Sequence, residues 1–372
     1  MVWETRAVSS QRAEFVSLAR QEGANISELC RRFEISRPTA YKWVRRFEEE
    51  GAAGLEDRSH RPQRSPRQTA PETEEAIVGL RTRHPHWGGR KLRRLLQRDG
   101  VAPLPAASTV TRVLHRRGLI TPSPSHHKPW ERFEAAAPNL LWQMDFKGPL
   151  QLTDGPVYLL ASLDDHSRYA TMLRACPDQR AETVREALTA TFRRYGLPRE
   201  FLVDNGAPWG SDQDHPHTVL TAWLLQLGVD VSHGRPYHPQ TQGKVERFNG
   251  TLEAELLRDL AFADRTTIQP ILDGFRLLYN SERPHQALGY ATPLSRYRPS
   301  LRRFTDDPGP ITYEPGDEVR IVQAGGWFTF EGRAYHVSKA FRGYPIALRR
   351  SPDSGYGVYF CHKLIGTIEV GS

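Results

Sequence analysis

Three acidic residues stand in short strings that could bring their carboxylates together. The strings are WQMDF at 142–146, VDNG at 203–206 and GKVERFN at 243–249, and the residues are Asp145, Asp204 and Glu246. Mg²⁺ prefers oxygen ligands and is commonly held by one or two carboxylates together with a substrate phosphate. Two such ions about 4 Å apart can activate an attacking oxygen and stabilise the leaving oxygen of a phosphoryl displacement. These residues are therefore candidates for a two-metal site.

The residues around each carboxylate predict where it lies. Asp145 stands inside an apolar strand, where a buried charge is costly unless a cation compensates it. Asp204 follows the apolar strand 200–203 and so lies at a carboxyl strand end, where α/β proteins usually have their sites. Glu246 is expected in the first turns of a helix that Thr241 caps, directed back towards that sheet edge. Lys244 beside it is predicted to meet a phosphate.

Four further polar residues are predicted to assist this site: Asn205, His238, Arg247 and Asn249. His238 either hydrogen-bonds near the site or is an ordinary, satisfied loop histidine. The pair Asp164-Asp165 is interpreted as a turn between two strands, because Asp is a common turn former, with a polar role beside the site as the alternative. Asp212 and Asp214 are predicted to be solvated.

The chain around the triad alternates between strand and helix patterns. Strands are predicted at 140–146, 157–163, 169–173, 200–203 and 229–232, and helices at 180–195, 219–226, from 241 onward, and up to Tyr279-Asn280. This order predicts an α/β core with a mixed sheet over residues 139–302.

The N-terminal residues 1–56 predict a compact unit of three helices. Helices are expected at 10–22, from Asn25, and at 36–50, where Ser36 caps the helix and Gly51 ends it. The arrangement is that of a helix-turn-helix, with 36–50 as the recognition helix. Its predicted DNA-facing residues are Arg37, Thr39, Tyr41, Lys42, Arg45 and Arg46. Small units of this kind also mediate protein contacts, which is the alternative.

A second helical unit is predicted at 72–120, between the Arg- and Pro-rich linker 57–71 and the linker 121–138. It also resembles a helix-turn-helix. Its predicted DNA contacts are Arg90, Lys91, Arg94, Arg112 and Arg116. The alternative for its Arg-rich helix is an ordinary polar face.

The net charge of +8 is concentrated in these first residues. Residues 1–138 hold 25 Lys and Arg against 16 Asp and Glu, a net of +9, and the rest of the chain is close to neutral. A basic segment beside a neutral body is typical of a module that contacts phosphate backbones. A solvated basic surface remains the alternative.

The tail, residues 303–372, predicts a small all-β barrel of six short strands. The three cysteines lie far apart without a CxxC pair, which argues against a disulfide framework or a cysteine-based zinc site. No run of about 18 apolar residues and no signal-peptide pattern occurs. We therefore expect a cytoplasmic protein, associated with the nucleoid when bound to DNA.

The strings WQMDFKG, DDHSRY, VDNG, GRPYHPQTQGKVERFNGTL and YNSERPHQALG closely resemble the catalytic core of DDE transposases related to retroviral integrases, and the arrangement is similar to the IS481 group. The resemblance implies a ribonuclease H-like core in which Asp145, Asp204 and Glu246 hold two Mg²⁺ ions, with Mn²⁺ as a substitute. It implies binding to terminal inverted repeats, cleavage by water, and attack of the freed 3′-hydroxyl on target DNA. It also implies double-stranded DNA and further copies of this chain as partners, in a dimer or higher oligomer.

The chain departs from the retroviral pattern in two ways. Glu246 follows Asp204 by 42 positions, an interval longer than is typical of the retroviral type, and the extra length is expected in 207–218. The N-terminal zinc-binding His and Cys set of retroviral integrases is absent, so recognition of DNA ends is expected from the helix-turn-helix units.

Two other functional classes stay open at this point. One is a DNA-binding regulator derived from a transposase, whose core is only a scaffold; loss of a triad member would indicate it, and none is lost. The other is a ribonuclease H-like nuclease that hydrolyses without transferring, which product analysis would separate.

Overall fold

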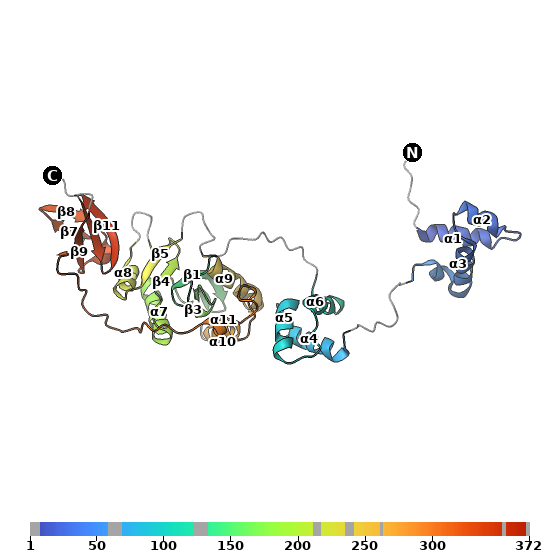
Figure 1. The fold of residues 1–372 in the computed structure, drawn as a ribbon, viewed down its shortest axis with the longest axis horizontal. Coiled ribbons are helices and arrows are strands. Elements are labelled where there is room, and N and C mark those ends of the chain that lie inside the picture. Colours follow the sequence, from blue (N-terminus) through green and yellow to red (C-terminus); the bar gives the residue numbers. More distant parts are fainter. Residues whose placement is uncertain are drawn as a thin grey trace. The chain divides into compact units, whose positions relative to one another are not determined.

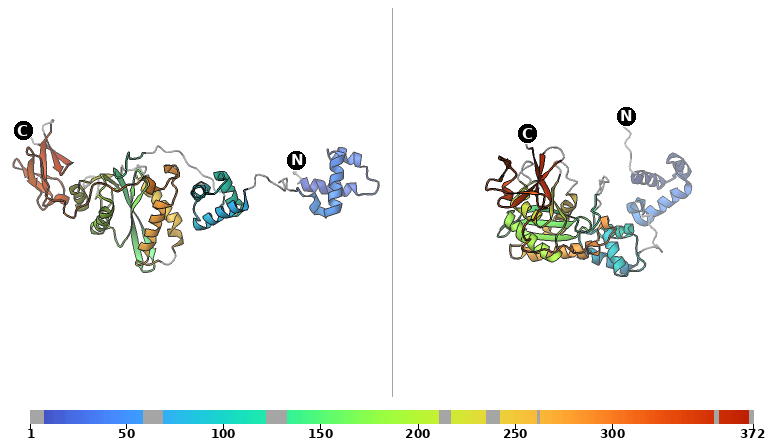
Figure 2. Two further views of the ribbon diagram at one scale, coloured as in Figure 1. Left: turned by 60° about the horizontal axis from the view of Figure 1, so that its bottom comes forward. Right: turned by 60° about the vertical axis from the view of Figure 1, so that its left-hand side comes forward.

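The computed structural model describes residues 8–58, 69–121, 133–210, 217–234, 242–260, 263–351 and 355–369. The chain forms two compact units, 1–68 and 69–372. Figure 1 labels their elements, and Figure 2 gives two further views. None of the helices in the described ranges is long and apolar enough to cross a membrane.

The first unit consists of α1 (Val8–Ala19), α2 (Ile26–Arg32), α3 (Arg37–Glu50) and a 3₁₀ turn, η1 (Gly51–Leu55). The predicted caps are confirmed. Asn25 accepts from the amides of Ser27 and Glu28, Ser36 accepts from Thr39, and Gly51 ends α3 with a φ of 65°. The core of this unit gathers residues from every helix: Phe15, Val16, Cys30, Ala40, Trp43 and Leu55.

The second unit begins with three helices, α4 (Pro71–Arg83), α5 (Gly89–Arg98) and α6 (Ala107–Arg116). Their apolar faces pack together into a core formed by Ile77, Leu80, Trp87, Leu92, Leu95, Leu96, Val110, Val113 and Leu114. Gly89 is required where α5 meets α6, because a Cβ there would lie 2.9 Å from the carbonyl oxygen of Ala107.

The central sheet has the order β3-β2-β1-β4-β5. Its strands are β1 (Leu141–Leu152), β2 (Gly155–Asp164), β3 (Ala170–Cys176), β4 (Glu200–Val203) and β5 (Asp230–His233). β1, β2 and β3 pair antiparallel, whereas β1, β4 and β5 pair parallel. The predicted mixed sheet is therefore confirmed.

Helices cover both faces of this sheet. α7 (Ala181–Tyr195) and α8 (Val219–Gln226) pack on the face that carries Trp142, Met144 and Phe201. α9 (Gly243–Glu255) and α10 (Ile268–Ser281) pack on the opposite face, against β2 and β3. The described part of the second unit also contains the short helical turns η3 (Leu257–Asp259), η4 (Gln286–Leu288), α11 (Pro293–Arg296) and η5 (Lys339–Phe341).

The six predicted C-terminal strands are all present: β6 (Glu318–Ile321), β7 (Trp327–Phe330), β8 (Arg333–His336), β9 (Pro345–Arg350), β10 (Gly355–Phe360) and β11 (Lys363–Glu369). They form a four-stranded sheet, β11-β10-β9-β6, and a separate hairpin of β7 and β8. In the described residues these sheets do not join into one hydrogen-bonded barrel, so the predicted barrel is not confirmed. Their core includes Ala222 and Leu225, which attaches this domain to α8.

Candidate active site

Asp145 and Asp204 lie at matching positions on neighbouring parallel strands. β1 and β4 pair Leu141 with Glu200 and Gln143 with Leu202, and the same offset leads from Asp145 to Asp204 just beyond the last pair. Neighbouring strands are about 4.8 Å apart, and alternate residues share a face. Both carboxylates therefore point to the α9 side of the sheet, because the intervening apolar residues face α7 and α8.

Helix α9 brings Glu246 to the same edge. Asn249, one turn after Glu246, donates from Nδ2 to Asp145 Oδ2 at 2.8 Å. Residues three apart share a helix face. Asn249 is buried and Glu246 is exposed, so the amide reaches the sheet while the carboxylate stands at the rim.

The three carboxylates interact electrostatically. The pKa of Asp145 is raised to about 6, first by burial and then by the negative charge of Asp204, with a smaller effect of Glu246; the Asn249 amide works against the rise. Burial also raises the pKa of Asp204, against a backbone hydrogen bond from Gly206 and the nearby His233. Like charges gathered in a half-buried place favour either protonation or a bound cation.

The carboxylate and amide oxygens at this edge are the ligand type that Mg²⁺ prefers, but they do not lie close enough together to form a complete site. Within the described residues, no three His, Cys, Asp or Glu side chains are grouped tightly enough to hold a metal ion. Asn249 Oδ1, beside Asp145, is buried and has no hydrogen-bond partner there. An orphan oxygen next to mutually repelling carboxylates fits a hard cation or its bound water.

The start of α9 is held by Gln143, two residues before Asp145. Its Oε1 accepts from the backbone amides of Lys244 and Val245, both at 3.2 Å. The first amides of a helix need such outside acceptors, and the N-cap residue Gln242 supplies no side-chain bond. Gln143 thus ties the helix of Glu246 to the strand of Asp145. The predicted cap, Thr241, lies outside the described residues.

Asp165 holds both Gln143 and Lys244 in place. It is fully buried and accepts from Gln143 Nε2 at 2.9 Å and from the Ala135 amide at 2.7 Å, and it forms a close ion pair with the Lys244 ammonium. Burial, against the attraction of Asp165, lowers the pKa of Lys244. In this structure Lys244 is paired with Asp165, and its contact with a phosphate stays a prediction.

Asp164 has the structural role predicted for the pair. Its carboxylate accepts from the Ser167 amide at 2.8 Å and from the Asn139 amide at 2.7 Å, which closes the turn after β2. Asp165 and Gln143 were not among the predicted site residues. The only local signal for Gln143 was a polar residue inside an apolar strand.

The other accessory candidates are only partly placed. Asn205 donates to the Gly234 carbonyl at 3.1 Å, which links the ends of β4 and β5. Arg247 is exposed and lines an open groove of about 570 Å³ along α9, together with Glu246, Lys91 and Arg283. His238 lies outside the described residues.

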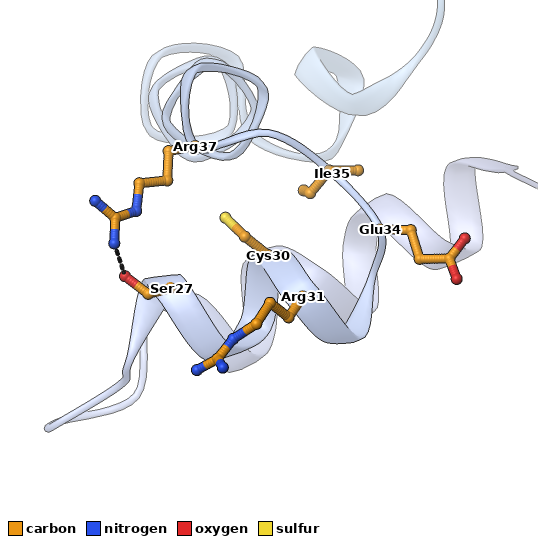
Figure 3. A pocket seen from close by; sticks show the side chains of 6 residues that line it. All are labelled: Ser27, Cys30, Arg31, Glu34, Ile35 and Arg37. Carbon is orange, nitrogen blue, oxygen red and sulfur yellow. Dashed lines mark hydrogen bonds between the residues drawn. The ribbon is translucent and has the colours of Figure 1, made fainter.

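On α3, four predicted DNA-facing residues are exposed: Arg37, Tyr41, Lys42 and Arg45. Thr39 is half-buried beside Ser36. Arg37 donates to the Ser27 hydroxyl at 2.6 Å, across a shallow depression between α2 and α3 (Figure 3).

Arg46 corrects the prediction for α3. It is 7% exposed, donates to the Glu56 carbonyl at 2.8 Å and lies 4.7 Å from the Trp43 ring. The prediction that Arg46 lies on the outer face is wrong, because its guanidinium binds the backbone just after the 3₁₀ turn η1.

In the second helical unit Arg90, Arg94 and Arg112 are exposed as predicted. Arg116 forms a close ion pair with the buried Glu74. Lys91 is half-buried, with its Nζ 3.6 Å from Glu255 Oε1 at the end of α9, so it does not point freely to solvent.

Comparisons with known protein families match most of the described chain. Residues 11–63 match a helix-turn-helix domain and 39–114 a homeodomain-like domain. Residues 135–239 and 227–293 match integrase core domains. Residues 317–371 match the C-terminal domain of IS481 family transposases. The resemblance noted in the sequence is thereby confirmed.

Relatives of the whole chain are distant. An uncharacterised 31.7 kDa protein of insertion element IS407 from Burkholderia multivorans is 25% identical over 62% of this chain and 82% of its own length. The transposase of insertion sequence element IS904 from Lactococcus lactis is 27% identical over 43% of this chain and 62% of its own length. The Gag-Pol polyprotein of koala retrovirus is 23% identical over 52% of this chain, but only 11% of the polyprotein is covered.

Among solved structures, a simian T-cell lymphotropic virus intasome bound to PP2A regulatory subunit B56 gamma is 17% identical, with a TM-score of 0.39, over 76% of this chain and 91% of that chain. The HTLV-2 integrase catalytic core domain in complex with magnesium is 16% identical, with a TM-score of 0.36, over 44% of this chain and 100% of that chain. Scores this low do not by themselves establish the fold.

Proposed function

From a chain that joins helix-turn-helix domains, an integrase core and the C-terminal domain of IS481 family transposases, we propose a DNA transposase. It binds the terminal inverted repeats of an insertion sequence, cuts the ends of the element and joins the freed 3′-hydroxyls to target DNA.

One observation carries the catalytic part of this proposal. Asp145 lies within β1, Asp204 follows the end of the neighbouring parallel strand β4 at the matching offset, and Asn249, one turn from Glu246, donates a hydrogen bond to Asp145. These contacts support a site at one edge of the sheet that combines the three carboxylates, which are far apart in sequence.

Asp145, Asp204 and Glu246 would hold two Mg²⁺ ions, for which Mn²⁺ would substitute. When bound, such ions supply a nucleophilic oxygen at neutral pH and stabilise the leaving oxygen. The residues of the chain do the positioning. Asn249 orients the Asp145 carboxylate, and Gln143 holds the start of α9 against β1. No covalent intermediate with the protein is needed.

DNA recognition is assigned to residues 1–120. The exposed cations of α3 and α5 support this assignment, because phosphate contacts supply most of the affinity for DNA. Joining two ends of one element requires at least two copies of the chain, so we propose a dimer or a higher oligomer on DNA. The three cysteines are free thiols, as in proteins of the reducing cytoplasm.

The test is strand transfer on a labelled duplex of the element's end, with Asp204→Asn and Glu246→Gln. We expect transfer to fall by about 1000-fold or more in each, since groups that act as a unit fail together. Binding of the end duplex should persist. Glu253→Gln is the matched control, because this half-buried glutamate of α9 pairs with Lys147 and takes no part in the proposed site. Joining that survives in either variant would contradict the assignment, and cut but never joined ends in the unmodified protein would indicate a nuclease.

A further inference from the structure

Glu255, the last residue of α9, is a buried carboxylate outside the acidic triad. Its side chain is 9% exposed and gathers three donor residues from two separate segments of the chain. Arg283 approaches with Nη2 at 2.8 Å and Nε at 3.1 Å, and the Trp87 indole N–H donates at 3.1 Å. Lys91 Nζ lies at 3.6 Å. This carboxylate is therefore where the helical unit of α4–α6 meets the catalytic core.

Trp87 is held rigidly on its own side of this contact. It is 2% exposed and stacks on His84 with ring centroids 3.9 Å apart. Its carbonyl accepts from Arg81 at 2.9 Å, and the same guanidinium reaches the Leu119 carbonyl at 3.0 Å. A buried indole N–H needs an acceptor, and for Trp87 that acceptor belongs to α9.

The charges around Glu255 keep it ionised. Burial opposes its ionisation, but the hydrogen bond and charge of Arg283, together with Lys91 and Trp87, hold its pKa below the usual value. Arg283 is fixed in turn, with its guanidinium 5.6 Å from the Tyr279 ring. Removing the carboxylate would leave the neighbouring Arg283 and Lys91 charges uncompensated, so the contact depends strongly on Glu255.

The same helix carries Glu246 at its other end. Nine positions of α helix separate Glu246 from Glu255, a length of about 14 Å. The groove along α9 runs between them, and Arg247, Lys91 and Arg283 line it together with the two glutamates. A shift of helices α4–α6 relative to α9 would therefore also change the distance between these helices and Glu246.

We propose that Glu255 is a positioning residue: it docks the α4–α6 unit on α9 through Trp87 and Arg283, so that a DNA end held by that unit reaches Glu246 in register. This inference rests on the proposed function. It assigns to Glu255 no contact with DNA or metal.

The experiment compares Glu255→Gln and Trp87→Phe, singly and together, with Glu253→Gln in the full-length protein. Glutamine keeps the size of Glu255 but removes its charge, and phenylalanine removes only the indole N–H. We expect the transfer rate at saturating end duplex to fall about 10- to 100-fold in each single variant, the cost typical of a small misplacement of the reacting groups. The double variant should be no worse than the worse single one, and the affinity for the end duplex should be unchanged.

Hydrogen exchange without DNA tests the docking separately from activity. We expect faster exchange in residues 84–95 of Glu255→Gln, but not of Glu253→Gln. Normal transfer by Glu255→Gln, with Asp204→Asn inactive, would overturn the positioning role and leave the proposed function intact. Unchanged exchange, or a loss of end binding that parallels the loss of transfer, would also overturn it. An active Asp204→Asn variant would instead refute the proposed function.

Discussion

Helices α3 and α5 lie in different groups of helices, and each carries exposed cations beside cations that are turned inward. In α3, Arg46 bonds to Glu56 and packs on Trp43, so its charge closes its own unit. In α5, Lys91 reaches beyond the three helices α4–α6 to Glu255 on α9. An inward cation can thus stabilise its own group of helices or connect that group to another element, while its exposed neighbours stay accessible to solvent.

Substitution of adjacent arginines tests the first half of this comparison. Arg46→Met should lower the opening free energy of the first unit by about 2 kcal/mol, because it loses a charged hydrogen bond and a cation–π contact. Arg45→Met, on the exposed side, should change it by less than about 0.5 kcal/mol. Amide hydrogen exchange in α1–α3 of the full chain measures both values. Equal protection in the two variants would place Arg46 on the surface.

DNA affinity tests the roles of the exposed cations. Arg45→Met and Arg90→Met should each weaken binding of the end duplex by about 1 kcal/mol and reduce the salt slope by about 1, since each would lose one phosphate contact. Lys91→Met should leave the slope unchanged because Glu255 holds that ammonium. Titrations at several salt concentrations give the slopes. A reduced slope in Lys91→Met would mean that Lys91 binds phosphate. It would contradict the distinction between exposed cations that bind DNA and inward cations that bind protein groups.

The smallest expected effect concerns stability and pH. The pKa of Lys91 is lowered to about 8, first by burial and then by Arg283. A lysine in the unfolded chain keeps its proton to higher pH, so between about pH 8 and 10.5 the unfolded state binds more protons and the free energy of unfolding rises with pH. Lys91→Met should lack this rise and be more stable at pH 7 by about 1 kcal/mol or less, because partial exposure screens the charge.

Denaturant unfolding of the full-length protein at pH 7 and pH 9.5 measures this difference, with Arg90→Met as the control. A Lys91→Met variant that is less stable at pH 7 would show that the ion pair with Glu255 outweighs the cost of burying the ammonium. Lys91 would then stabilise the contact between α5 and α9, just as Arg46 stabilises the first unit.

By itself the sequence determined most of the helices and strands. Strand 200–203 and helix 219–226 have the predicted bounds, because apolar runs, caps and glycines act within a few residues. The positions of Asp145 inside a strand and of Asp204 after the end of strand 200–203 follow from the same local patterns. The pairing of β1 with β4, which brings these two positions side by side, comes from the tertiary structure.

Only the tertiary structure decided which polar side chains turn inward. Gln143 meets the start of α9 across 101 positions, and Asp165 meets Lys244 across 79. The positions of long cations such as Arg46 and Lys91 in the helical pattern are equally compatible with contact to solvent, to DNA or to a buried acceptor. Their partners come from distant segments, so no local pattern distinguishes these outcomes. Likewise, whether six short strands close into a barrel depends on pairings between strands, which their individual patterns do not specify.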